Sequence, residues 1–149
     1  WSSGFEELIQ LDPAARENLI VGSNYYYTID NPENKKFVEA YKKKFKGVPP
    51  GYAGAAGYGL MKMTLLGMQK SGSTEPQKVI TALEEHKGKN FVGDFEIRGR
   101  NHQTVRPFFV LQTKKKNEMK NQYDMAEVVD VSSTEQPKNI NMCKDIGSF

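Results

Sequence analysis

Residues 19–41 carry a strand signal that runs through three consecutive tyrosines into a helix start. Residues 19–21 are a short apolar run that predicts a buried strand, and the tyrosines at 25–27 follow it. Asn31 is a good N-cap, and Pro32 suits the first helical position, where its missing N–H costs nothing. A strand that leads into a helix through such rings predicts an α/β chain with a ligand cleft at the junction.

Three helices are predicted from this junction onward. The first starts at Pro32 and ends at Gly47, the second covers residues 52–70, and the third follows the capping-box pair Thr74 and Gln77. The second segment is apolar or small on nearly every side, so we expect this helix to be largely buried.

Strand patterns follow the helices. Residues 90–98 alternate in polarity and are predicted to form a strand, with residues 105–113 as its hairpin partner, and residues 123–131 are predicted to add a last strand. Residues 132–149 are mostly polar, which predicts a tail with little core of its own. A chain of 149 residues with 38% hydrophobic content can bury one moderate core.

The charge and hydropathy patterns exclude several classes of protein. The formal net charge is +3, and the lysine runs at 42–44 and 114–116 lack a nucleic-acid-reading pattern, so we expect surface lysines and no nucleic-acid partner. No apolar run reaches the roughly 18 residues of a membrane span. Cys143 is the single cysteine, so the 149 residues cannot form an internal disulfide or a cysteine metal site.

No catalytic constellation is predicted. His86 and His102 have neither zinc-site nor triad spacing, and we expect an exposed helix end for the first and a hydrogen bond within residues 101–103 for the second. The adjacent glutamates at 6–7 and 84–85 point in different directions on a helix and are predicted to face solvent. We therefore predict no enzyme activity, no metal and no cofactor.

Tyr25 and Tyr27 are the candidate binding residues of the junction, because tyrosine combines apolar area with a hydroxyl group. In an extended segment these two rings share one side, opposite Tyr26, so one face of the triplet can line a cleft. For each ring, packing at the strand end and contact with a ligand are both consistent with the sequence.

The segments 51–58 (GYAGAAGY) and 94–98 (DFEIR) complete the pattern of the tyrosine junction. In order and spacing, the chain resembles the extracytoplasmic solute-binding proteins of bacterial ABC importers, of the branched-chain amino-acid and amide type. The resemblance implies the α/β fold of the type I periplasmic binding proteins, in which three crossovers join two flavodoxin-like or Rossmann-like lobes.

Only the C-terminal portion of that fold is implied, over residues 1–131. Residues 28–89 correspond to helices of the first lobe, residues 90–131 to strands that return to the second lobe, and residues 132–149 to a tail. Such a portion alone is expected to bind a solute weakly or not at all.

The resemblance also implies a function, which is capture of an amino acid or related small organic solute in a cleft between the lobes. Position by position, it assigns ligand contacts to Trp1, Tyr25, Tyr27 and Tyr52. The family commonly has an acidic or polar group near Trp1, so an indole there favours an aromatic, amide-bearing or bulkier solute. The implied partner is a membrane permease, and the implied location is periplasmic or extracellular.

Two other functions fit the sequence. A ligand-sensing domain of a receptor or regulator would have the same fold and would differ in its flanking sequence. A small α/β enzyme would lose turnover when His102 or a carboxylate is substituted, whereas a binding protein shows no turnover and melts at a higher temperature with its solute.

Overall fold

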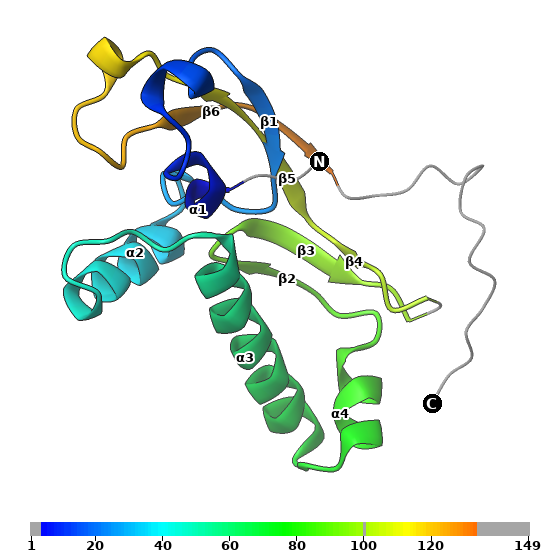
Figure 1. The fold of residues 1–149 in the computed structure, drawn as a ribbon. Coiled ribbons are helices and arrows are strands. Elements are labelled where there is room, and N and C mark those ends of the chain that lie inside the picture. The colour runs from blue at the N-terminus through cyan, green and yellow to red at the C-terminus, as the bar shows by residue number, and fades with distance from the viewer. Residues whose placement is uncertain (1–3, 100, 134–149) are drawn as a thin grey trace, which may run out of the picture.

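The computed structural model describes residues 4–99 and 101–133, which form helices and two antiparallel sheets (Figure 1). This mixture confirms the predicted α/β class. One sheet has the strand order β1-β5-β6 and the other has the order β2-β3-β4. The strands are β1 (Ile20–Ser23), β2 (Lys87–Asn90), β3 (Gly93–Ile97), β4 (Thr104–Val105), β5 (Pro107–Thr113) and β6 (Ala126–Ser133).

The helix predicted from Pro32 starts as expected. The side-chain oxygen of Asn31 accepts hydrogen bonds from the N–H groups of Glu33 at 2.8 Å and Asn34 at 3.3 Å, which confirms Asn31 as the N-cap. The helices are α1 (Phe5–Leu8), α2 (Pro32–Lys44), α3 (Tyr52–Ser71) and α4 (Pro76–Leu83), with 3-10 turns η1 (Pro13–Arg16) and η2 (Lys116–Glu118). No helix among the described residues has the length and apolar content of a membrane span.

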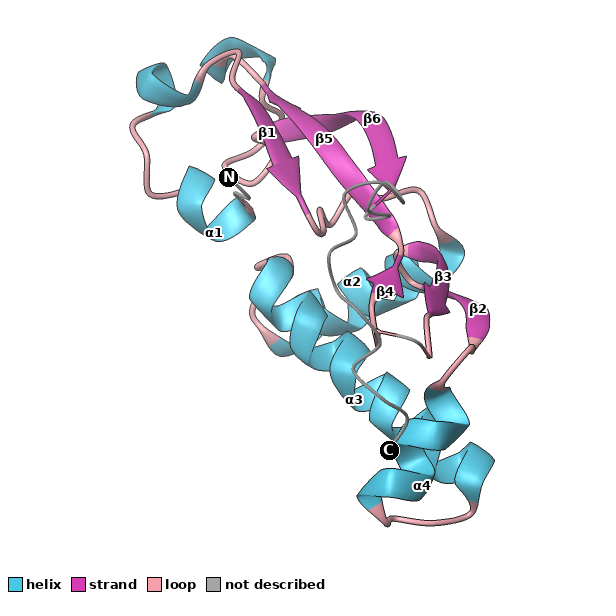
Figure 2. Ribbon diagram, turned by 90° about the vertical axis from the view of Figure 1, so that its right-hand side faces the viewer, coloured by secondary structure: helices cyan, strands magenta, loops and turns pink. Residues whose placement is uncertain are grey.

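The elements gather around the two sheets. In Figure 1, α1 lies beside the β1-β5-β6 sheet, whereas α3 and α4 lie beside the β2-β3-β4 sheet, and Figure 2 shows the same grouping from the side. Within the described residues the chain crosses between the two groups twice. Residues 24–31 lead from β1 to α2, and Arg106 separates β4 from β5.

The core is continuous beneath these crossings and is rich in aromatic rings. The ring centroids of Phe37 and Tyr58 are 4.4 Å apart in a stacked pair, and those of Tyr25 and Phe91 are 5.8 Å apart. On β5, alternate residues are buried, and Leu111 has no exposed surface. One face of β5 is therefore core, as expected for a strand with period-2 burial.

The predicted hairpin of residues 90–98 with 105–113 is right only at its turn end, where Val105 pairs with Glu96, and it is wrong for residues 107–113. β3 pairs with β2 and β4, while β5 pairs with β1 and β6. The turn into β3 is tight because Asn90 Oδ1 accepts a hydrogen bond from the N–H of Val92 at 2.9 Å and Gly93 has a φ of +131°. Strand β2 was not predicted, because lysine, glycine and asparagine are all depleted in strands.

The predicted capping box of Thr74 and Gln77 is also wrong. α4 has Glu75 as its N-cap, without a side-chain hydrogen bond, and its first residue is Pro76. The fixed φ of proline suits the first helical position and sets the start there.

The prediction that the helix over residues 52–70 is largely buried is wrong. Within α3, all of whose residues are described, only Ala55 and Gly67 are buried, and Leu60 is 70% exposed. A Cβ placed on Gly67 would lie 2.7 Å from Val79 Cγ1, so this side of α3 packs closely on α4. α3 therefore carries more apolar side chains than the described residues cover.

The last strand extends further than predicted. β6 spans Ala126–Ser133 rather than residues 123–131, so Ser132 and Ser133 belong to the sheet and not to the expected tail. The rest of that tail, residues 134–149 with Cys143, lies outside the described residues.

Candidate functional site

The two crossing segments lie against each other. The guanidinium Nη1 of Arg106 donates a hydrogen bond to the carbonyl oxygen of Asn24 at 2.9 Å. Arg106 is partly buried, and the loss of solvation lowers the pKa of its guanidinium from the ordinary value. This bond connects the segment that leaves β1 to the segment that enters β5. We call these two segments, residues 24–31 and Arg106, the double crossing.

Tyr25 is buried beneath the first crossing. Its side chain is 3% exposed, and its hydroxyl donates a hydrogen bond to Asn34 Oδ1 at 2.9 Å. The amide nitrogen of Asn34 donates to the carbonyl oxygens of Tyr27 at 3.1 Å and Ile29 at 2.9 Å. Burial raises the pKa of Tyr25 well above its ordinary value, so the hydroxyl stays a neutral donor. Asn34 thereby fixes the crossing to the first turn of α2.

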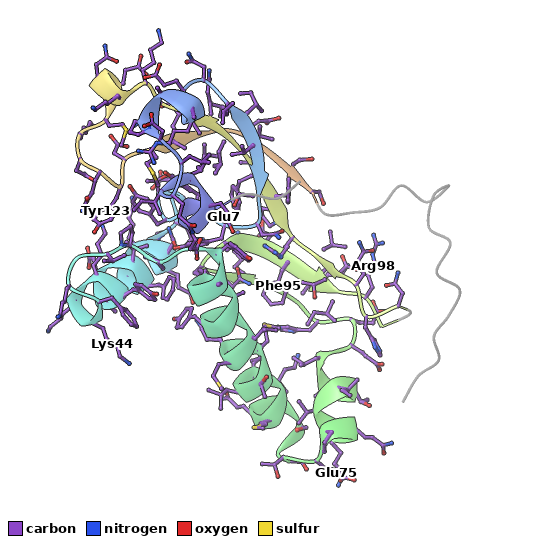
Figure 3. All side chains as sticks on the ribbon, in the orientation of Figure 1. Glu7, Lys44, Glu75, Phe95, Arg98 and Tyr123 are labelled. Atoms are coloured by element: carbon purple, nitrogen blue, oxygen red, sulfur yellow. The ribbon has the colours of Figure 1, made fainter. Side chains whose placement is uncertain are left out.

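Tyr26 reaches the first residue of β6, and Tyr27 reaches the loop before it. The hydroxyl of Tyr26 accepts a hydrogen bond from the N–H of Ala126 at 3.1 Å, and the hydroxyl of Tyr27 donates to the carbonyl oxygen of Tyr123 at 2.8 Å. Figure 3 shows Tyr123 beside α2, in the loop that leads to β6. Burial, together with the negative charge of Asp124, raises the pKa of Tyr27 to about 12.

The predicted pairing of Tyr25 with Tyr27 on one side, opposite Tyr26, is wrong. The rings of Tyr26 and Tyr27 lie 5.0 Å apart, whereas Tyr25 packs on Phe37 and Phe91. The period-2 rule does not apply here because β1 ends at Ser23, before the triplet begins.

A second contact bridges the two groups of elements at the start of α3. The carboxylate of Glu6, on α1, accepts hydrogen bonds from the backbone N–H groups of Tyr52 at 3.2 Å and Ala53 at 3.4 Å. The N-cap of α3 is Gly51, which has no side chain to bind these groups. Figure 3 shows the neighbouring Glu7 on α1 close to the first turn of α3. Glu6 therefore acts as an N-cap from a distant part of the sequence.

The predicted site residues do not share a described hollow. Trp1 lies outside the described residues, Tyr25 is in the core, and Tyr27 is half-buried against Tyr123. Tyr52 is 40% exposed at the start of α3. The contacts bring Tyr25 and Tyr27 to the double crossing and place Tyr52 beside Glu6. The ligand-binding roles of all four residues stay predictions.

Two hollows are found elsewhere on the described surface. The first has a volume of about 320 Å³ and lies between α3 and the β2-β3 strands, lined by residues such as Met63, Leu66 and Phe95. The second, of about 590 Å³, is an open depression that includes Arg106 and Pro107. Neither is lined by Tyr25, Tyr27 or Tyr52.

The two histidines have pairwise partners. His102 Nε2 lies 2.9 Å from Glu84 Oε1, on the C-terminal cap of α4, and within residues 101–103 the N–H of Gln103 donates to Asn101 Oδ1 at 3.2 Å. His86 Nδ1 lies 2.9 Å from Lys70 Nζ, and desolvation followed by the charge of Lys70 lowers the pKa of His86. Among residues 4–99 and 101–133, no three His, Cys, Asp or Glu side chains form a group that could hold a metal ion.

Three residues of the junction were missed by the sequence analysis: Glu6, Asn34 and Arg106. The adjacent glutamates were expected to face solvent, yet Glu6 binds α3 and Glu84 binds His102. For Glu6, the sequence offered one signal, which is the glycine at position 51 before the helix. A helix whose N-cap is glycine needs an acceptor for its first N–H groups from elsewhere in the chain. The chemistry available at this junction is hydrogen bonding and ring contact.

The comparisons with known proteins agree on one family. Residues 1–118 match the family model described as periplasmic binding protein. No curated protein matches the chain. The chain is similar to the solved structure of an amino acid ABC transporter substrate-binding protein from Pseudomonas fluorescens Pf-5, with 27% identity and a TM-score of 0.85. That match covers 93% of this chain and 36% of the other.

Two further solved structures share the fold. One is a solute binding protein of an ABC transporter from Rhodopseudomonas palustris BisB5 in complex with 3,4-dihydroxy benzoic acid, with 18% identity and a TM-score of 0.70 over 97% of this chain and 36% of that one. The other is a branched chain amino acid ABC transporter periplasmic ligand-binding protein from Burkholderia xenovorans LB400, with 20% identity and a TM-score of 0.77. That match covers 85% of this chain and 33% of the other. The chain thus spans about a third of the length of the solved structures it matches.

Proposed function

Because the chain belongs to the periplasmic binding protein family, we propose that it is the C-terminal part of the solute-binding component of an ABC importer. The fold that the resemblance implied is the fold of the solved relatives. In this proposal residues 28–89 are helices of one lobe, residues 90–131 contain the return to the other lobe, with Arg106 as the crossing, and no bond of the solute is broken.

The double crossing is the observation that carries the proposal. Two segments that pass side by side between two groups of elements, with Arg106 bonded to Asn24, are what a hinge between lobes requires. A hinge permits closure around a solute, and the closed state is favoured by contacts that only that state makes. The crossing is held on both sides, since Asn34 fixes residues 27–29 to α2 and Tyr27 reaches Tyr123.

We propose an amino acid or a related amide or aromatic acid as the solute. This range is supported by the amino acid transporter component from Pseudomonas fluorescens and by the relative solved with 3,4-dihydroxy benzoic acid. Trp1 and Tyr52 are proposed to contact the solute through their rings. Tyr25 and Tyr27, whose hydroxyls already bind Asn34 and Tyr123, are proposed to act on it through the crossing that they support.

The proposed setting follows from the family. A solute-binding component of an ABC importer works in the periplasm or outside the cell and delivers its solute to a membrane permease. A receptor-type sensor with the same fold is the alternative, and it would bind the same class of solute without a permease.

The test uses the complete reading frame that contains these 149 residues, since a binding cleft needs both lobes. Thermal unfolding would be followed with leucine, glutamine, phenylalanine and 3,4-dihydroxybenzoate, each at millimolar concentration. A cognate solute at a hundred times its Kd adds about 2.7 kcal/mol of stability, which is a readily measured rise in Tm. The proposal predicts such a rise and saturable heat of binding for at least one solute; an unchanged Tm across the whole panel would overturn it.

A matched pair of variants tests the site. Tyr52→Ala is expected to weaken solute binding about tenfold or more, as loss of an aromatic anchor does. Leu11→Ala, at a side chain that is similarly exposed, should leave the Kd unchanged. Equal affinity of both variants would remove Tyr52 from the site.

A further inference from the structure

The C-terminal end of α2 gathers lysines around two exposed apolar side chains. Phe45 is 44% exposed and Val48 is 37% exposed, although both are apolar. Lys43, Lys44 and Lys46 lie beside them in sequence, and all three are exposed. We call these five residues the α2 tip. In Figure 3 the labelled Lys44 lies at the outer edge of the molecule, at the end of α2.

Backbone hydrogen bonds hold the α2 tip in a tight turn. The N–H of Gly47 donates to the carbonyl oxygen of Lys42 at 2.8 Å, and the N–H of Val48 donates to that of Phe45 at 3.0 Å. Lys46 and Gly47 have φ values of +52° and +87°, the left-handed geometry that commonly ends a helix. The chain therefore turns back on itself, which keeps Val48 next to Phe45 and the lysines around both.

The positive charges of the α2 tip are not neutralised by carboxylates within the described residues. The lysines that form ion pairs there are Lys35, Lys62, Lys78, Lys87, Lys89 and Lys114. Residues 40–48 contain four lysines and no acidic residue. The helix dipole favours lysines at the end of α2, but it does not account for an exposed aromatic ring among them. The ring and the charges together indicate an interaction surface.

We propose that the α2 tip is a contact site for a phospholipid bilayer whose headgroups carry negative charge. Phe45 and Val48 enter the headgroup region, and the ammonium groups around them bind lipid phosphates. Lysine is a flexible point charge, which suits a fluid sheet of phosphates, whereas bidentate recognition of carboxylates favours arginine. The tip has no arginine.

The surroundings of the α2 tip also favour an extended surface over a small ligand. Neither of the two hollows described above is lined by a residue of α2. One ring and three lysines give weak, reversible membrane binding, so the contact keeps the protein near a bilayer without anchoring it. The inference rests on the α2 tip and not on the proposed solute or permease.

The test measures binding of the complete polypeptide that contains these 149 residues to vesicles, by co-sedimentation. One set of vesicles has equal amounts of phosphatidylcholine and phosphatidylglycerol, and the other has phosphatidylcholine alone. The wild type is expected to bind the first set more tightly. Each lysine near an anionic surface contributes a factor of about five, so loss of three should weaken binding about a hundredfold. The variant that removes them combines Lys43→Gln, Lys44→Gln and Lys46→Gln.

Two matched controls accompany this variant. The first removes the same charge from exposed positions on α4 and β2, and should bind as the wild type does, because salt screens charges that do not touch the bilayer. It combines Lys78→Gln, Lys87→Gln and Lys89→Gln. The second control concerns the ring. Phe45→Ala should weaken binding about tenfold through lost apolar area, whereas Leu11→Ala, at a side chain that is also 44% exposed, should not.

Three results would overturn the proposal. Equal binding of the wild type to both sets of vesicles would exclude recognition of anionic lipid. Equal weakening by the tip variant and its charge-matched control would show that only net charge matters. Binding of soluble polyglutamate but not of vesicles, lost in the tip variant, would identify an acidic protein as the partner. None of these readouts depends on the solute, so failure here is distinct from failure of the proposed function.

Discussion

The side chain of Arg106 is bonded to the backbone of Asn24, across 82 positions of sequence, by a hydrogen bond of 2.9 Å. This bond links the only two segments by which the described chain passes between its two groups of elements. A motion that separates these two segments would therefore break the bond.

Arg106→Ala is expected to destabilise the protein by about 1.5–3 kcal/mol, because a charged hydrogen bond is lost and the Asn24 carbonyl loses its donor. Urea unfolding would measure the change. Lys78→Ala, which removes an exposed ion pair with Glu75, is the control and should cost less than about 1 kcal/mol. Equal losses in the two variants would show that the Asn24 contact does not stabilise the junction.

Alkaline pH should weaken the fold through Tyr27. Its pKa is raised from 10.0 to about 12, so the unfolded chain loses this proton before the folded chain does. The stabilisation is complete below pH 10 and is lost as pH rises toward 12. The free energy of unfolding should therefore fall over this range, and less steeply in Tyr27→Phe. Tyr52→Phe is the control, and a slope that neither substitution changes would contradict the assignment.

Gly51→Ala should act by displacing Glu6. A Cβ at Gly51 would lie 1.8 Å from the Glu6 carboxylate carbon, so the carboxylate must leave the N–H groups of Tyr52 and Ala53. Loss of this cap is expected to cost about 1 kcal/mol. Glu6→Ala should cost a similar amount, and the double variant no more than either single one, measured by urea unfolding as a double-mutant cycle. Additive losses would show that the two residues do not interact.

Two glycines of α3 should respond in opposite directions to alanine. Gly67→Ala places a Cβ 2.7 Å from Val79 Cγ1 and is expected to destabilise the α3–α4 packing by about 1–3 kcal/mol. Gly57→Ala meets no described atom within 4 Å and should stabilise the 149-residue chain by about 0.5–1 kcal/mol, because alanine favours helix. Thermal unfolding would compare the two, and a stabilising Gly67→Ala would contradict the packing described here.

Local sequence signals were sufficient for much of the fold. The start of α2 was predictable because the cap lies within three residues of the groups it binds. The hairpin was predicted correctly only at Glu96 and Val105, next to its turn. The rest was mispredicted because strand pairing depends on distant partners: β5 pairs with β1 and β6, and no alternation pattern identifies them. The burial of α3 was mispredicted because hydropathy reports how apolar a helix is, and not how many of its residues the rest of the described chain covers.

The candidate site was less accessible to sequence reasoning. Tyr25 and Tyr27 were singled out from residue type, but their hydroxyl partners, Asn34 and Tyr123, depend on where the crossing turns. Glu6 and Arg106 gave no signal at their own positions, because each one binds backbone groups that lie 46 or more positions away in sequence, and only the glycine N-cap at Gly51 indicated that an acceptor was needed. Long-range bonds from side chain to backbone carry no residue-type signature at the acceptor or donor end.

The register of the β1-β5-β6 sheet also bears on how the protein is made. Ile20 pairs with Gln112, so β1 leaves the ribosome about ninety residues before its neighbour exists, and closing so long a loop delays the pairing. Throughout that interval β1 lacks β5, its one partner among the described strands, and it is followed by three tyrosines. Chaperone binding during synthesis should therefore concentrate on the nascent chain between the emergence of β1 and that of β5.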